Sequence, residues 1–228
     1  EVLFQDSTLT ANRKHIMALC QKMIEERLNI KWICLSRVDN VDRELLGLMK
    51  KAGCHSIQFG VESGDENILK DMQKGISKEQ VRKAFQWCKE VKIRTNGFFI
   101  IGMPRETEET IRKTIDFAKE LDCDVATFSL PMPHSGTKLG EMVKNNGSDF
   151  TEKDLFDDVS VSDVATPNLP KETILKLRNQ AYREFYLRPK YILKKITQVT
   201  SFHELLMYFN AFSSILKEIL SKSYKKVS

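Results

Sequence analysis

Four charged residues, Asp6, Arg37, Glu62 and Glu106, follow short apolar runs of this 228-residue sequence. An arginine binds a carboxylate through two parallel hydrogen bonds, and a carboxylate such as Glu62 can accept from both hydroxyls of a ribose diol. Asp6 suits an ammonium group. If these side chains converge, they can hold a zwitterionic ligand. Each carboxylate alone also has a simpler explanation, because a glutamate at the position of Glu62 or Glu106 also stabilises the N-terminus of a helix.

A repeating order of strands and helices has to bring these residues together. Five apolar runs predict strands, and the segments between them have the apolar period of helices. The runs are Val2–Phe4, Trp32–Leu35, Ser56–Val61, Phe98–Ile101 and Val125–Leu130. They begin roughly every 30 residues, the length of a βα unit, which predicts a parallel sheet.

Two folds fit this alternation, a barrel and a doubly wound sheet. Continuous apolar strands predict that both faces of the sheet are covered. The absence of G-x-G-x-x-G after the first strand weighs against a dinucleotide-binding fold. Ser63–Glu66 and Ser77–Gln80 are predicted capping boxes, and Thr10 is the predicted cap of a helix over residues 13–26.

The opening letters EVLFQ also match a protease site used to remove tags. Two features favour a native first strand instead. The run fits the spacing of the other four strands, and Asp6-Ser7 follows where such a protease site is normally followed by Gly-Pro.

Chemistry in parallel barrels lies at the carboxyl ends of the strands. The five predicted ends are all polar or rich in glycine and proline, and they converge on one mouth. Gly102 at one of them would let the backbone approach a flat ring. The ends are Asp6-Ser7, Ser36 to Asp39, Glu62 to Gly64, Gly102 to Thr107 and Pro131 to Thr137.

The five cysteines are too far apart for a zinc ribbon or an iron–sulfur loop, so no metal site is predicted in this chain. Their odd number and scatter predict reduced, buried thiols. With no signal peptide and no long apolar stretch, a cytoplasmic location is expected and no membrane span. The cysteines are Cys20, Cys34, Cys54, Cys88 and Cys123.

Positive charge is concentrated in residues 171–228, with 12 Lys and Arg against 4 Asp and Glu. Two interpretations stand: solvated faces of packed helices, or contact with an acidic partner such as RNA or a membrane surface. The lysines are scattered, which favours the first and makes nucleic acid the less expected partner. The expected division is a barrel over 1–145, a linker over 146–170 and a helical region over 171–228. An apolar stripe, Leu205 to Leu216, is expected to pack on the barrel or on a part of the protein outside this chain.

Several long stretches of the sequence resemble one family. They cover nearly the whole chain in the same order, and no single motif among them is decisive. Together they resemble the radical S-adenosylmethionine superfamily, in the branch that often carries an N-terminal cobalamin-binding (B12-binding) domain. The stretches are "FQDSTLTANR", "KWICLSRVD", "ELLGLMKKAGCHSIQFGVESGDENILKDMQKG", "TNGFFIIGMPRETEETIRKTIDFAKEL", "PHSGTKL" and "AYREFYLRPKYILKKI".

The resemblance implies a partial TIM-like (β/α)6 barrel, of which strands two to six are present, followed by helices. It implies a [4Fe–4S] cluster that reductively cleaves S-adenosylmethionine to start radical chemistry, such as methylation of a small-molecule substrate. It also implies contacts with S-adenosylmethionine: Asp6 and Ser7 near the amino group, Ser36 and Arg37 facing the carboxylate, Glu62 near the ribose, Ile100, Ile101 and Gly102 beside the adenine, and Leu130 and Pro131 beneath it.

The chain departs from the family pattern in three places. Asp6-Ser7 stands where the family often has Asp-Asp, and Pro133 to Thr137 stands where it often has Pro-x-Pro-Gly-Thr. The cluster-binding C-x3-C-x2-C loop is absent. We therefore expect this chain to be a fragment, inactive alone, of a longer enzyme that supplies the cluster ligands. The alternatives are a cluster-free binding or assembly module on the same barrel, and a fragment of an RNA-modifying radical enzyme.

This interpretation makes a prediction about the native gene. Upstream of the codon for Glu1, we expect a three-cysteine loop within roughly 30–50 residues, one βα unit. Sequencing the native locus checks it. A start codon directly before Glu1, or tag sequence running into it, would contradict the fragment interpretation.

Overall fold

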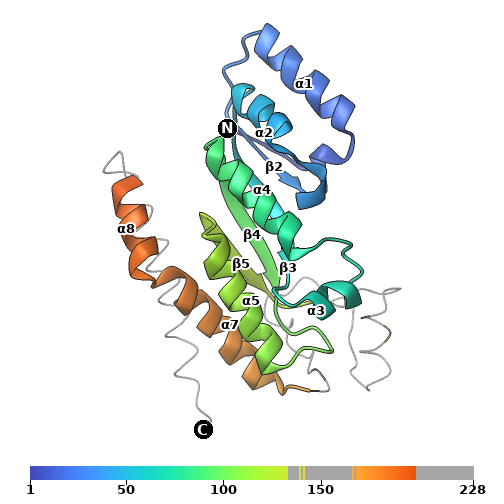
Figure 1. Cartoon of the computed structure of the whole chain (residues 1–228), viewed down its shortest axis with the longest axis vertical. Helices are drawn as coiled ribbons and strands as arrows, with labels where there is room; N and C mark the ends of the chain where they lie inside the picture. Colours follow the sequence, from blue (N-terminus) through green and yellow to red (C-terminus); the bar gives the residue numbers. More distant parts are fainter. Residues whose placement is uncertain (133–138, 140, 142–165, 167, 199–228) are drawn as a thin grey trace.

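The computed structural model describes residues 1–132, 139, 141, 166 and 168–198. Within these residues, five parallel strands form one sheet in chain order, as predicted (Figure 1). Since each strand lies beside the next one in sequence, the sheet has no point at which its winding reverses. This order is that of a partial barrel, not of a doubly wound sheet. The strands are β1 (Val2–Phe4), β2 (Trp32–Ser36), β3 (Cys54–Glu62), β4 (Arg94–Ile100) and β5 (Val125–Ser129).

Helices follow each strand and carry the predicted apolar faces. In α4, for example, Val81, Ala84, Phe85 and Cys88 are all buried. The helices are α1 (Arg13–Glu25), α2 (Arg43–Lys51), α3 (Glu66–Asp71), α4 (Lys78–Glu90), α5 (Glu108–Leu121), α7 (Lys171–Tyr186) and α8 (Pro189–Gln198), with short 3-10 helices η1 (Leu9–Ala11) and η2 (Val38–Asn40).

Of the three predicted helix caps, one is confirmed and two are wrong. Ser77 and Gln80 form the predicted capping box of α4. Asn12, not Thr10, caps α1, because the Thr10 hydroxyl is buried in a hydrogen bond with Ser36 of β2. Asp65, not Ser63, caps α3, because the Ser63 hydroxyl forms a hydrogen bond with Thr114 of α5.

The core lies between the sheet and its helices. Side chains of β3 alternate: Ile57, Phe59 and Val61 are fully buried, whereas Gln58, Gly60 and Glu62 lie half-buried on the other face. The continuous apolar runs predicted two covered faces. The inner face, opposite the helices, is instead only partly covered and carries polar groups. All five cysteines are free and buried, as predicted.

Helices α7 and α8 attach to β5 through tyrosine hydroxyls. The Tyr182 hydroxyl bonds to the backbone N–H and C=O of Phe128, and Tyr186 bonds to Ala126 in the same way. The Tyr191 hydroxyl donates to the Asp124 carbonyl at 2.9 Å. The backbone groups on the outer side of β5 therefore have side-chain partners, which blocks this edge from pairing with another strand.

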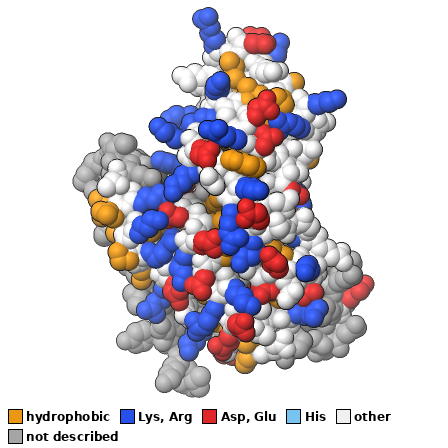
Figure 2. Space-filling view, in the orientation of Figure 1, with side chains coloured by type: hydrophobic (Ala, Val, Ile, Leu, Met, Phe, Trp, Pro, Cys, Tyr) orange, Lys and Arg blue, Asp and Glu red, His pale blue; other side chains and the backbone are white. Residues whose placement is uncertain are grey.

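Several basic residues of the C-terminal region take part in packing this region onto the sheet. Arg188 and Lys190 form ion pairs with Asp122, and Lys194 pairs with Asp124. Figure 2 shows Lys and Arg side chains interspersed with Asp and Glu over this face of the molecule. These ion pairs favour the interpretation that the cations lie on solvated faces of packed helices over contact with an acidic partner. The stripe Leu205 to Leu216 and the loop Pro133 to Thr137 lie outside the described residues.

Substitution of Phe128 tests the attachment of α7. The Phe128 ring is buried and stacks on Phe99, with Tyr182 and Phe185 against its edge. Phe128→Ala is expected to lower the free energy of unfolding by about 3–5 kcal/mol, because it leaves a cavity between sheet and helix. Denaturant unfolding measures this change. Leu193→Ala, at a side chain that is 64% exposed, is the control, and equal losses in the two variants would contradict the packing described.

Candidate ligand-binding site at the strand ends

Glu62 ends β3 in an unusual backbone conformation. Its φ is +68°, and the Ser63 N–H donates to the Val61 carbonyl at 2.9 Å, so Glu62 occupies the centre of a γ-turn. The register with β4 shifts between Gly60 and Glu62, as at a bulge. Such conformations cost a non-glycine residue free energy and occur often at functional sites.

The turn directs the Glu62 carboxylate onto Lys74, which follows α3. Lys74 Nζ and Glu62 Oε1 lie 2.5 Å apart, with side chains 22% and 14% exposed. Gly60 makes room for the pair, since a Cβ there would lie 2.4 Å from Glu62 Oε1 and 2.8 Å from Lys74 Nζ. The pair therefore covers a strand position that only glycine can occupy without displacing it.

Arg37 lies beside this pair at the end of β2. Its Nε and Nη2 donate to the two oxygens of Asp39 at 3.0 and 2.8 Å, and Nη2 also donates to the Lys74 carbonyl at 2.9 Å. The hydrogen bond to Asp39 and the nearby charge of Glu62 raise the pKa of Arg37 against the opposing effect of burial. Nη1 makes no hydrogen bond to the described residues and is available to a ligand.

The structure brings Arg37 and Glu62 together, as the strand ends predicted, and adds Lys74, which the sequence reasoning missed. The only signal for Lys74 was a basic residue placed one short helix after Glu62. Asp6 and Ser7 are exposed after β1, at the same edge of the sheet. The Ser36 side chain is buried, and its hydroxyl bonds to Thr10 and to the Arg37 carbonyl.

The predicted adenine-side residues differ in their exposure. Ile100 and Leu130 are half-buried, whereas Ile101 is fully buried in the core and Pro131 is buried. Gly102 has a φ of +105°, and a Cβ there would lie 3.0 Å from Ile174 of α7. Glycine is therefore required at this position by the backbone and by α7, besides any approach to a ligand ring.

Glu106 does not join the other charged residues. Its side chain is fully buried, and Oε2 accepts from the N–H groups of Gly102 and Met103 at 2.6 and 2.9 Å. Burial raises the pKa of Glu106 to about 7 although these two hydrogen bonds favour the charged form. Oε1 has no partner. Glu106 thus holds the loop after β4 in place.

A metal centre does not arise from the residues that the structure describes. In this part of the chain, no three His, Cys, Asp or Glu side chains are grouped to hold an ion. Burial raises the pKa of Cys20 to about 11 and that of Cys123 to about 12. Both remain thiols near neutral pH, whereas a metal requires thiolates. The described helices also include none long and apolar enough to cross a bilayer.

A singly wound parallel α/β sheet with charged residues at its strand ends has the architecture of a partial barrel. The sequence model of the Radical SAM superfamily matches residues 2–118, from β1 into α5. The chain belongs to this superfamily.

Relatives in the family are longer than this chain. An uncharacterized methyltransferase of Pyrococcus horikoshii is 36% identical over 200 residues, which are 86% of this chain and 43% of the relative. The anaerobic magnesium-protoporphyrin IX monomethyl ester cyclase of Rubrivivax gelatinosus is 30% identical over 148 residues, 62% of this chain and 27% of the relative. The chain therefore spans less than half the length of either protein.

Solved structures share the fold. The radical S-adenosylmethionine methyltransferase TsrM from Kitasatospora setae, with cobalamin and a [4Fe–4S] cluster bound, superimposes with a TM-score of 0.58 at 24% identity, over 63% of this chain and 30% of that one. Coproporphyrinogen III oxidase from Escherichia coli gives a TM-score of 0.57 at 16% identity, over 79% and 38%. The partial barrel predicted from the sequence is confirmed.

The raised pKa of Glu106 predicts how stability depends on pH. The folded-state pKa of Glu106, about 7, lies above the ordinary 4.5. The stabilising contribution of Glu106 to the fold is therefore fully present below pH 4.5 and is lost as pH rises through 7. Glu106→Gln imitates the protonated side chain. Between pH 4.5 and 8, the wild type should therefore lose about 3 kcal/mol of unfolding free energy relative to the variant. Denaturant unfolding across this range measures the difference. Exposed Glu108→Gln is the control, and parallel profiles for wild type and Glu106→Gln would contradict a raised pKa.

Proposed function

We propose that this chain is the S-adenosylmethionine-binding part of a radical S-adenosylmethionine enzyme. The observation that carries the proposal is the Glu62–Lys74 pair over Gly60, with Arg37 beside it, at the mouth of a family barrel. The Glu62 carboxylate suits the ribose diol of that ligand, and the two cations beside it, Lys74 and Arg37, suit its amino acid carboxylate.

Each residue has a distinct part in this binding. Glu62 accepts from the ribose hydroxyls, and its turn holds the carboxylate toward the mouth. Lys74 Nζ and the available Nη1 of Arg37 attract the methionyl carboxylate, while Asp39 holds the Arg37 guanidinium in one orientation. Asp6 and Ser7, exposed at the end of β1, receive the ammonium group. Half-buried Ile100 and Leu130 offer apolar surface to the adenine.

The [4Fe–4S] cluster does not fit the residues of this chain. Its sequence has no C-x3-C-x2-C loop, and the described cysteines are buried thiols. We therefore assign the cluster ligands to sequence of the parent protein outside these 228 residues. The parent is proposed to be a methyltransferase-like or oxidoreductase enzyme of the cobalamin-binding branch. Its substrate is proposed to be a small molecule, and its location the cytoplasm, where five free thiols remain reduced.

Two other functions stay open to test. A cluster-free module would bind S-adenosylmethionine as part of an assembly, without any cluster in the parent. An RNA-modifying parent would show salt-dependent RNA binding. The ion pairs of Arg188, Lys190 and Lys194 with Asp122 and Asp124 favour a packing role for these cations over contact with phosphate.

Glu62→Gln tests the proposed site. Calorimetric titration of S-adenosylmethionine into the chain measures its affinity. The amide replaces one acceptor oxygen by a donor and removes the charge that pairs with Lys74, so the affinity should fall at least about tenfold, or ~1.4 kcal/mol. Glu66→Gln, at an exposed residue of α3, should bind like the wild type. If the Glu62→Gln variant binds S-adenosylmethionine as tightly as the wild type, or if the wild type does not bind it, the proposed site is contradicted.

A further inference from the structure

The turn at Glu62 needs an anchor, because its positive φ is unfavourable for a residue with a side chain. The next two residues supply one by packing against α5. Gly64 is so close to that helix that a Cβ would lie 2.3 Å from the Lys113 carbonyl oxygen and 2.7 Å from Thr114 Cα. Ser63 and Gly64 are buried there, 50 residues away in sequence from the helix that holds them.

Thr114 of α5 is the centre of the contact. Its hydroxyl accepts from the Gly64 N–H at 2.9 Å, lies 3.1 Å from the Ser63 hydroxyl, and donates to the Thr110 carbonyl at 3.2 Å. Since that one proton goes to Thr110, the Ser63 hydroxyl is the donor to Thr114. A hydroxyl has one donor and two acceptor sites, so Thr114 uses all three. Its side chain is fully buried, and no water can replace these bonds without opening the contact.

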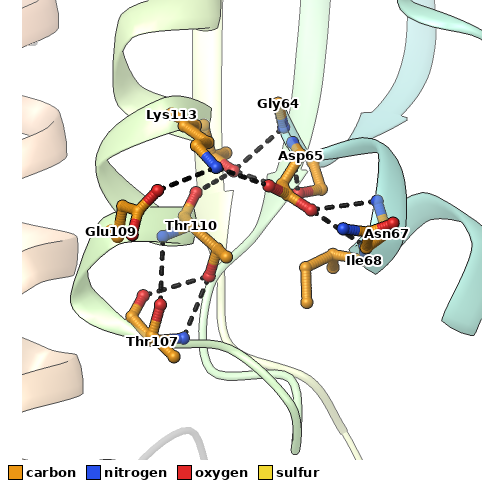
Figure 3. A network of polar contacts seen from close by, with 10 residues as sticks. Gly64, Asp65, Asn67, Ile68, Thr107, Glu109, Thr110 and Lys113 are labelled. Atoms are coloured by element: carbon orange, nitrogen blue, oxygen red, sulfur yellow. Dashed lines mark hydrogen bonds and ion pairs between the residues drawn. The ribbon is translucent and has the colours of Figure 1, made fainter.

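A second contact fixes the start of α3. Asp65 caps this helix by accepting from the N–H groups of Asn67 and Ile68. Lys113 Nζ lies 3.1 Å from Asp65 Oδ2 and 3.0 Å from Glu109 Oε1. Figure 3 shows Lys113 between these two carboxylates. Burial tends to raise the pKa of Asp65, but the bonds from Lys113, Ile68 and Asn67 outweigh it and lower that pKa. These contacts explain why Ser63 is not the helix cap: its hydroxyl is turned to Thr114 and to the Asp65 N–H.

Both members of the binding pair are thereby tied to α5. Glu62 directly precedes the anchored Ser63-Gly64 segment, and Lys74 follows the helix that Asp65 starts. We infer that Thr114 is a positioning residue for S-adenosylmethionine binding: it holds the γ-turn that directs Glu62 toward the ligand and Lys74. This inference rests on the ligand role proposed for Glu62.

The test compares variants that remove or keep the Thr114 hydroxyl. Thr114→Val has nearly the same shape but leaves the Gly64 N–H and the Ser63 hydroxyl without their acceptor. It should bind S-adenosylmethionine at least about fivefold more weakly than the wild type, or ~1 kcal/mol. Thr114→Ser keeps the hydroxyl, and its affinity for S-adenosylmethionine should lie within about twofold of the wild-type affinity. All titrations are made well below the unfolding temperature of each variant.

Thr95→Val is the matched control, because it also removes the hydroxyl of a buried threonine. Thr95 is 6% exposed on β4, and its hydroxyl makes no hydrogen bond to the described residues. This variant should retain wild-type affinity. If it loses as much as Thr114→Val, the effect is general destabilisation and the positioning role is overturned. Wild-type affinity in Thr114→Val overturns it too.

A second readout separates this inference from the proposed function. In the ligand-free protein, the side-chain carboxyl ¹³C resonance of Glu62 should move in Thr114→Val and remain in place in Thr114→Ser and Thr95→Val. If the wild type binds no S-adenosylmethionine, the proposed function fails, and this resonance still decides whether Thr114 sets the turn. Should Thr114→Val not fold, Ser63→Ala removes the other hydroxyl of the contact and should move the same resonance. An unmoved resonance in the folded variant contradicts the inference.

Discussion

The site depends on one backbone constraint, the turn that makes Glu62 leave β3 with a positive φ. If β3 continued as a regular strand, the Glu62 carboxylate would not be directed across Gly60 toward Lys74. The turn instead lays it across Gly60, where it meets Lys74 at 2.5 Å. An unfavourable conformation of this kind persists only when its surroundings determine it. Here the surroundings are α5, through Thr114, and the glycine at position 64 that lets the helix approach the strand end.

The same helix connects the site to the rest of the fold. On one side, α5 holds the loop that carries Glu62 and the start of α3. On the other, Lys119 of α5 pairs with Glu184 of α7, the helix whose tyrosines satisfy the backbone of β5. Ile174 of α7 in turn packs against Gly102 at the end of β4. The helical region after the barrel is therefore part of the support for two strand ends.

The local pattern of apolar residues predicted most of the fold, because strand and helix periodicity depend on residues that are neighbours in sequence. All five strands and the convergence of Arg37 with Glu62 follow from apolar runs and from where parallel strands end. Lys74 was missed because its return to Glu62 depends on the geometry of α3, which spacing alone does not specify. Glu106 stands at a strand end like Glu62, yet its side chain turns inward to two backbone N–H groups. The caps at Thr10 and Ser63 were wrong for one shared reason: each hydroxyl has a partner on a distant element, Ser36 for Thr10 and Thr114 for Ser63.

The central claim is that S-adenosylmethionine binds at the ends of β2 and β3. A crystal structure of the chain soaked with S-adenosylmethionine tests it most directly. The account predicts ribose hydroxyls within hydrogen-bonding distance of the Glu62 carboxylate, and the methionyl carboxylate beside Lys74 Nζ and Arg37 Nη1. A ligand bound elsewhere, with the Glu62–Lys74 pair unchanged and free of contact, would contradict it.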